Sequence, residues 1–132
     1  MEALKGALRL TLPFPPSVNR AWRMVRIGSR CRMLLSREGR AYRRDACARL
    51  AALVGQMARE GRSLDGPLRV VVTLHPPDRR KRDVDNAMKA LLDALQHAGV
   101  IRDDSQVGDL HIFRGEIVKG GCAIVEIVET TD

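Results

Sequence analysis

The apolar stretch Leu68 to Leu74 constrains the fold of this chain more than any other segment. It is rich in β-branched residues and is bounded by the turn Asp65-Gly66-Pro67 and by Pro76-Pro77, which predicts a buried strand. A helical pattern follows from about Asp85 to Ala98, and Gly99 is placed to end that helix. A buried strand that is followed by a helix and further strands favours a sheet with helices packed on it.

Further elements are predicted on both sides of this unit. A first strand spans about Leu8 to Leu12, and a long helix begins after Ser36, a good N-cap, and ends at Gly61. Two closing strands span about Val107 to Val118 and Cys122 to Val128, and the glycines between them predict a hairpin turn. The resulting order is βαβαββ.

This order predicts a single α+β domain over residues 1–132, with a mixed four-stranded sheet on which the helices pack. A long irregular stretch, about Ser17 to Leu35, interrupts the pattern after the first strand. A loop of this length inside a small domain is usually functional or mobile. It contains a tryptophan and five arginines, which are Trp22, Arg20, Arg23, Arg26, Arg30 and Arg32.

The composition points to an anionic partner. The chain has 23 Lys and Arg against 16 Asp and Glu, a net charge of +7, which favours nucleic acid or, less often, a membrane surface. No apolar run approaches the ~18 residues of a membrane span, and no signal-peptide pattern is present. The three cysteines, Cys31, Cys47 and Cys122, form no disulfide or zinc-site pattern. We therefore expect a soluble cytoplasmic protein with no membrane partner and no small-molecule cofactor.

The densest chemistry is at Asp83 and Asp85, which are two positions apart and point the same way in extended backbone. Two carboxylates aimed at one spot repel each other unless a cation lies between them, and Mg²⁺ prefers oxygen ligands. Lys89 is one helical turn beyond Asp85, where it would stabilise developing negative charge in phosphodiester hydrolysis. Two alternatives stay open: Asp85 as a helix N-cap, and an ordinary Asp85–Lys89 ion pair worth ~0.3–0.5 kcal/mol.

Four consecutive cations precede this acidic pair, and they are Arg79, Arg80, Lys81 and Arg82. We interpret them as phosphate-binding residues that hold a DNA backbone beside the metal. A solvated charge run, partly neutralised by neighbouring aspartates such as Asp78, is the alternative.

Asp103 and Asp104 follow the second predicted helix. A strand–helix–strand unit would return them to the end of the strand that precedes Asp83, where one of them would complete the metal site. An ordinary acidic turn is the alternative. Other polar residues give weaker signals: the three histidines are scattered, and Ser17 and Asn19 either belong to a turn or line the site.

Four segments, in this order, resemble the RusA family of Holliday-junction resolvases over nearly the whole chain. They are Leu12 to Asn19, Ser36 to Arg43, Pro77 to Lys89 and Gly99 to Val107. Two features depart from the family pattern: Val18 stands where members often have asparagine, and Met24 to Leu35 is longer. We expect this longer segment to contact DNA or a partner subunit.

The resemblance implies an α+β RusA-like endonuclease domain, bacterial or phage-encoded, that uses Mg²⁺ or Mn²⁺. The family's catalytic, metal-binding acids fall on Asp83, Asp85 and Asp104, and its essential lysine falls on Lys89. Supporting positions fall on Asn86, Asp103 and Asn19. The family is homodimeric and cuts four-way junctions by paired nicks in recombination and repair, and a two-fold dimer matches the symmetry of such a junction.

The resulting hypothesis is a Mg²⁺-dependent, structure-selective endonuclease that resolves four-way junctions. One alternative is a Mg²⁺ nuclease that acts on other branched DNA, such as flaps or forks. The other is a non-catalytic, basic DNA-binding module, in which the carboxylates only cap a helix and pair with arginine.

Overall fold

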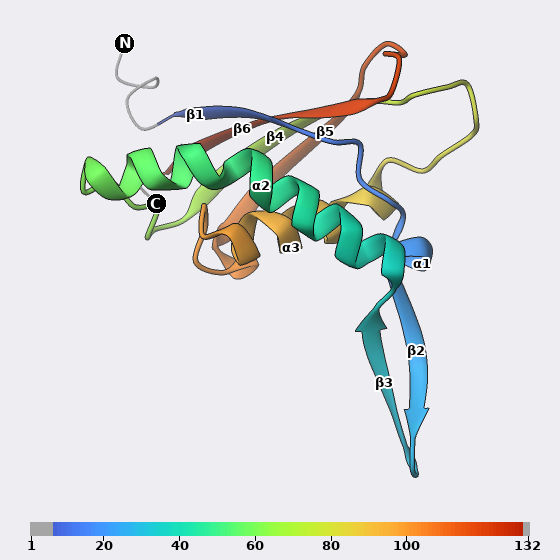
Figure 1. The fold of residues 1–132 in the computed structure, drawn as a ribbon. Coiled ribbons are helices and arrows are strands. Elements are labelled where there is room, and N and C mark those ends of the chain that lie inside the picture. The colour runs from blue at the N-terminus through green and yellow to red at the C-terminus, as the bar shows by residue number, and fades with distance from the viewer. Residues whose placement is uncertain (1–6, 131–132) are drawn as a thin grey trace.

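A four-stranded sheet lies at the centre of the computed structural model, which describes residues 7–130. Its strand order is β1-β6-β4-β5, with the bounds Leu8–Leu12, Cys122–Glu129, Leu68–His75 and Val107–Arg114. β6 is antiparallel to both of its neighbours, whereas β4 and β5 are parallel. The expected mixed sheet of an α+β fold is therefore confirmed (Figure 1).

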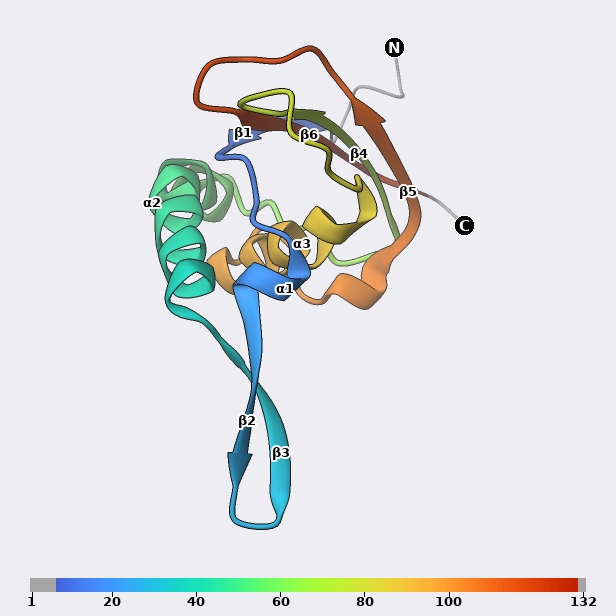
Figure 2. The same cartoon turned by 90° about the vertical axis from the view of Figure 1, so that its right-hand side faces the viewer.

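Both long helices, α2 (Arg37–Arg59) and α3 (Met88–Ala98), cover the same face of this sheet (Figures 1 and 2). Alternate residues of β1 and β4 are buried, as the period of two in a strand requires when one face is covered. The helices and the sheet share one apolar core, whose fully buried members include Leu12, Leu50, Val70, Val72, Leu91, Leu95, Val125 and Ile127.

The start of α2 has the predicted cap. The hydroxyl of Ser36 accepts a hydrogen bond from the backbone N–H of Gly39 at 3.0 Å. The Ser36 backbone N–H donates to the carbonyl oxygen of Ala21, the last residue of the short helix α1 (Val18–Ala21), at 2.8 Å. A Cβ atom at Gly39 would overlap that same oxygen. Glycine is therefore required here, because α1 lies directly against the first turn of α2.

The second predicted helix also forms, in two parts. The 3₁₀ turn η2 (Asp85–Ala87) leads into α3, and Gly99, at φ +90°, ends α3 in the left-handed conformation. Arg43 of α2 and Asp93 of α3 form an ion pair at 2.9 Å that joins the two helices. Among residues 7–130, no helix has the length and apolar content that crossing a membrane requires.

The stretch predicted to be irregular instead contains an antiparallel hairpin of β2 (Trp22–Ile27) and β3 (Arg30–Leu35). Gly28, at φ +63°, makes the turn. We call residues Trp22–Leu35 the arm, and Figures 1 and 2 show it projecting from the body on the side away from the sheet. The prediction was wrong because neither face of the arm is buried. Its sequence therefore lacks the polar–apolar alternation that identifies a half-buried strand.

The predicted hairpin between the last two strands is also wrong. β4 lies between β5 and β6, so residues 115–121 cross over the end of β4. The N–H groups of Gly115 and Val118 donate to the carbonyl oxygens of Leu74 and Pro76, which attaches this connection to β4. β6 buries three apolar residues and takes an inner position, whereas the more polar β5 ends at Arg114 and takes an edge.

Candidate active site

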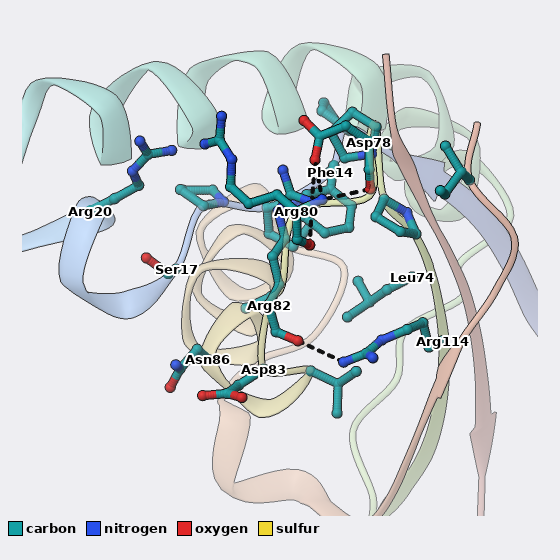
Figure 3. Close-up of a pocket in the computed structure, with 18 of the residues that line it drawn as sticks. Phe14, Ser17, Arg20, Leu74, Asp78, Arg80, Arg82, Asp83, Asn86 and Arg114 are labelled. Atoms are coloured by element: carbon teal, nitrogen blue, oxygen red, sulfur yellow. Dashed lines mark hydrogen bonds and ion pairs between the residues drawn. The ribbon is translucent and has the colours of Figure 1, made fainter. Parts of the chain in front are cut away.

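The acidic pair lies where the chain passes from the end of β4 into η2 and α3. Asp83 and Asn86 line a large open cleft of about 1280 Å³ (Figure 3). Asp85 is exposed and does not line this cleft. The extended backbone expected here is not observed, because Val84 between the two aspartates is helical (φ −66°, ψ −32°), so the two side chains do not point the same way. The Pro-rich segment after β1, the first turns of α2, the loop after β4 and the loop after β5 form the rest of its wall.

The helix-cap alternative for Asp85 is not observed. Asp85 is the first residue of η2, and the preceding Val84 occupies the N-cap position without a side-chain hydrogen bond. Within the described residues, neither Asp83 nor Asp85 has a hydrogen bond or an ion pair through its carboxylate. Both carboxylates are therefore free to bind a cation.

Lys89 does not form the ion pair with Asp85 that was the second alternative. Its ammonium group lies 4.6 Å from the centre of the Trp22 ring, a cation–π contact. Trp22 is the first residue of the arm, and its buried Nε1 has no hydrogen-bond partner among the described residues. The proposed catalytic lysine therefore contacts the base of the arm. Sequence spacing could not reveal this contact, because Trp22 and Lys89 lie in distant segments.

The four-cation run is only partly neutralised. The Arg82 guanidinium pairs with Asp78 at 2.9 Å and lies 5.4 Å from the centre of the Phe14 ring. The pKa of Asp78 is lowered, mainly by the hydrogen bond from the Arg82 side chain and next by the hydrogen bond from the Arg80 backbone N–H. Arg114, which the sequence analysis did not single out, donates to the Arg82 carbonyl oxygen at 2.6 Å (Figure 3).

The rest of the run is exposed, and its side chains form no ion pair within residues 7–130. These residues are Arg79, Arg80 and Lys81. Together with Arg20 they line the cleft beside Asp83, so the positive charge that the sequence placed next to the acidic pair is available to an anion. Asn19 lies on α1, is exposed and does not line the cleft, whereas its neighbour Ser17 does.

Asp103 and Asp104 lie elsewhere, which corrects their expected placement. The parallel register pairs Leu68, the first residue of β4, with Val107, the first residue of β5. Because α3 returns the chain to the start of β4, Asp104 lies at that end of the sheet, whereas Asp83 follows the opposite end. The expected return of Asp104 to Asp83 within one chain is therefore wrong.

The two neighbouring aspartates differ in their surroundings. Asp103 caps the 3₁₀ turn η3 (Asp104–Gln106) in a capping box with Gln106. Hydrogen bonds from Ser105 lower the pKa of Asp103. The carboxylate of Asp104 is exposed and has no hydrogen bond or ion pair within the described residues, while its backbone N–H donates to the Gln96 side chain at 3.0 Å. Asp103 has a structural role, and Asp104 is the member of the pair that is free to bind a ligand.

The residues near the cleft fit a hard divalent cation bound by few protein ligands. Among residues 7–130, no three His, Cys, Asp or Glu side chains are close enough together to hold a metal ion. Mg²⁺ is commonly held by only one or two carboxylates, and water and substrate phosphates complete its shell. The free carboxylate of Asp83 in the cleft offers one such ligand, and the exposed carboxylate of Asp85, two residues further along the chain, is the other candidate.

Comparison with known proteins extends these observations. A family model described as "Endodeoxyribonuclease RusA" matches residues 13–128. The crossover junction endodeoxyribonuclease of Enterobacteria phage 82 is 42% identical over 120 residues, 91% of this chain and 92% of the phage protein. The protein of the same name from phage HK97 is 39% identical over 121 residues, 92% and 93% of the two chains. The crossover junction endodeoxyribonuclease of Escherichia coli K12 is 41% identical over 120 residues, which cover 91% of this chain and 92% of the Escherichia coli protein.

Proposed function

The chain belongs to the RusA family of endodeoxyribonucleases, and from that premise we propose that it uses Mg²⁺ to hydrolyse phosphodiesters in four-way DNA junctions. The observation that carries the proposal is the pair of free carboxylates, Asp83 and Asp85, beside the exposed cations of residues 79–81. A DNA backbone that approached the carboxylates without those cations would be repelled.

Asp83 and Asp85 would hold the metal, and Asn86, which follows Asp85 in η2, would support them. The bound ion, Mg²⁺ or Mn²⁺, supplies an activated water and offsets negative charge on the phosphate. Arg79, Arg80, Lys81 and Arg82 bind the DNA backbone and orient the scissile phosphate. The Lys89 ammonium stabilises the charge that develops on the phosphate oxygens during in-line attack.

Asp104 is the third proposed acid. Within one chain it lies at the far end of α3 from Asp85, so it reaches an ion held by Asp83 and Asp85 only from another copy. In a two-fold homodimer, each chain would give its Asp104 to the site of the other chain. The dimer would then have two sites, which suits paired nicks in a two-fold symmetric junction. We place the dimer in the cytoplasm, where bacterial and phage DNA recombines.

The experiment is cleavage of a labelled synthetic four-way junction, with and without Mg²⁺, by wild type, Asp83→Asn and Asp85→Asn. Each variant should lose at least about 100-fold in rate, because a metal ligand is removed. Junction binding should stay within a few fold, since removing negative charge does not weaken an anion-binding surface. Asp65→Asn, an exposed aspartate outside the cleft, is the matched control and should cut normally.

Wild-type rates for either Asp83→Asn or Asp85→Asn would contradict the site. A parallel panel of flaps, forks and linear duplex tests the substrate, and equal rates on flaps and four-way junctions would favour the broader branched-DNA nuclease. Absence of any divalent-dependent cutting by the wild type would favour the non-catalytic binding module.

A further inference from the structure

Beyond Trp22 at its base, the arm makes an exposed surface that the proposed active site does not use. Its two strands pair over six positions, from Trp22 opposite Leu35 to Ile27 opposite Arg30. Six residues of strand extend about 20 Å, close to the width of a DNA duplex. Both views in Figures 1 and 2 show the arm clear of the sheet and of the long helices beyond its base.

Charge on the arm is of one sign. No acidic residue occurs between Ser17 and Arg37. The four arginines of the arm are exposed, and none of them forms an ion pair within the described residues. They are Arg23, Arg26, Arg30 and Arg32. Unpaired cations on a projecting element repel one another and attract an anionic partner.

The strand register divides these side chains between two faces. Arg23, Arg30 and Arg32 lie on one face, because alternate residues of paired strands share a face. Met24 and Met33 lie opposite each other on the second face and are 67% and 51% exposed. Arg26 lies on the face of the methionines, and the exposed Ile27 lies on the face of the other three arginines. Each face of the arm therefore combines positive charge with exposed apolar side chains, and three of the four arginines lie on one face.

Resting on the proposed function, we propose that the arm is a DNA-binding β-ribbon that enters a groove of one duplex branch of the substrate. The major groove, ~12 Å wide, admits a two-stranded ribbon. Arg23, Arg30 and Arg32 contact phosphates, and the methionine face lies against sugars and base edges. The base of the arm contacts Lys89 through Trp22, and Arg20, two residues before Trp22, lines the cleft, so DNA held by the arm would continue into the cleft.

A second copy of the chain is the competing occupant, and charge disfavours it. The arm carries four arginines that form no ion pair within residues 7–130. Two copies packed through their arms would bring these cations within the Debye length, ~8 Å at physiological ionic strength, where repulsion is poorly screened. A DNA phosphate backbone removes that repulsion instead.

The first test compares two triple variants that lose the same charge. One is Arg23→Gln, Arg30→Gln, Arg32→Gln, and the other, away from arm and cleft, is Arg9→Gln, Arg49→Gln, Arg59→Gln. Binding of linear duplex and four-way junction is measured against salt in EDTA, so that cleavage plays no part. The arm variant should bind about tenfold or more weakly, with a salt slope shallower by roughly 2–3, since each phosphate contact contributes ~0.9. An equal loss of DNA affinity in the two triple variants would overturn the proposal.

The second test uses a natural cysteine of the arm. Cys31 is exposed opposite Arg26, whereas Cys47 and Cys122 are half-buried and can be replaced by alanine. A photo-crosslinker on Cys31 should attach to labelled junction DNA. In the control, Cys31→Ala removes the arm cysteine and Ala58→Cys places one at the far end of α2. The same crosslinker on this control should not attach to the DNA. Crosslinks between two protein chains, with none to DNA, would show that a second copy occupies the arm.

Failure of the inference is distinguishable from failure of the proposed function. If the wild type cuts junctions but the arm triple binds DNA as tightly as the wild type does, the inference is wrong and the function stands. If the wild type cuts nothing and yet the arm triple loses DNA affinity, the function is wrong and the arm is still a DNA-binding element.

Discussion

Lys89 and Trp22 show how a single contact decides the role of a charged residue. A lysine paired with Asp85 would neutralise one of the proposed metal ligands, whereas the observed cation–π contact leaves Asp85 free. The indole also restricts a flexible side chain without cancelling its charge, since the ring attracts the ammonium only through its quadrupole. Trp22 is therefore a positioning residue for the proposed catalytic lysine.

Replacing Trp22 should affect cleavage more than folding. A cation–π contact contributes roughly 0.5–2 kcal/mol, so Trp22→Leu should lower the rate at saturating junction by about 2- to 30-fold. Trp22→Phe keeps an aromatic face and should recover most of that rate, which a loss of packing alone would not predict. Single-turnover cleavage measures both variants, and circular dichroism verifies folding. If leucine and phenylalanine gave the same rate, Trp22 would not act through Lys89.

At the scale of elements, the sequence predicts what local signals determine. β1, β4 and the two long helices form close to their predicted positions, because strand alternation, the Ser36 cap and the glycine at the end of α3 are all short-range features. The sequence also places the cation run directly before Asp83, since these residues are contiguous in the chain. It did not reveal that Asp83 and Asp85 point in different directions, because the backbone is already helical at Val84.

What the sequence did not predict depends on pairing between distant residues. Whether β6 pairs with β5 or inserts beside β4 is decided by burial across the whole sheet, which the glycines at 120 and 121 do not reveal. The position of Asp104 follows from the parallel register of β4 and β5, and the arm pairs without any buried face. The Trp22–Lys89 contact needs both α1 and α3 in place.

Two glycines of α2 provide a matched test of how the arm is attached. A Cβ at Gly39 would overlap the Ala21 carbonyl oxygen, whereas one at Gly55 would meet only the end of the Arg59 side chain at 3.4 Å. Gly39→Ala should therefore destabilise the fold by about 1–3 kcal/mol. Gly55→Ala should stabilise it by roughly 0.5–1 kcal/mol through helix propensity.

Urea unfolding measures both glycine variants. Gly39→Ala should also weaken DNA binding, because α1 and the base of the arm must move away from α2. A stabilising effect of Gly39→Ala would show that α1 does not lie as closely against α2 as the structure has it.

At the scale of the whole molecule, the separation of Asp104 from Asp83 makes the proposed site depend on two chains. Each site of the dimer would take Asp83 and Asp85 from one copy and Asp104 from the other. Neither Asp83→Asn nor Asp104→Asn should cut as a homodimer. In a mixed dimer, however, both substitutions fall in one site, and the other site keeps all of its acids.

Mixing the two inactive variants under conditions that exchange subunits should therefore restore single nicks in a four-way junction. Random exchange puts half of the dimers in the mixed form, and each of these has one working site, so about a quarter of the wild-type number of sites is recovered. Paired nicks within one binding event should stay rare, because no dimer has two intact sites. Denaturing gels of a doubly labelled junction separate single from paired nicks. If each chain instead carried a complete site of its own, every site in the mixture would lack one acid and no activity would return.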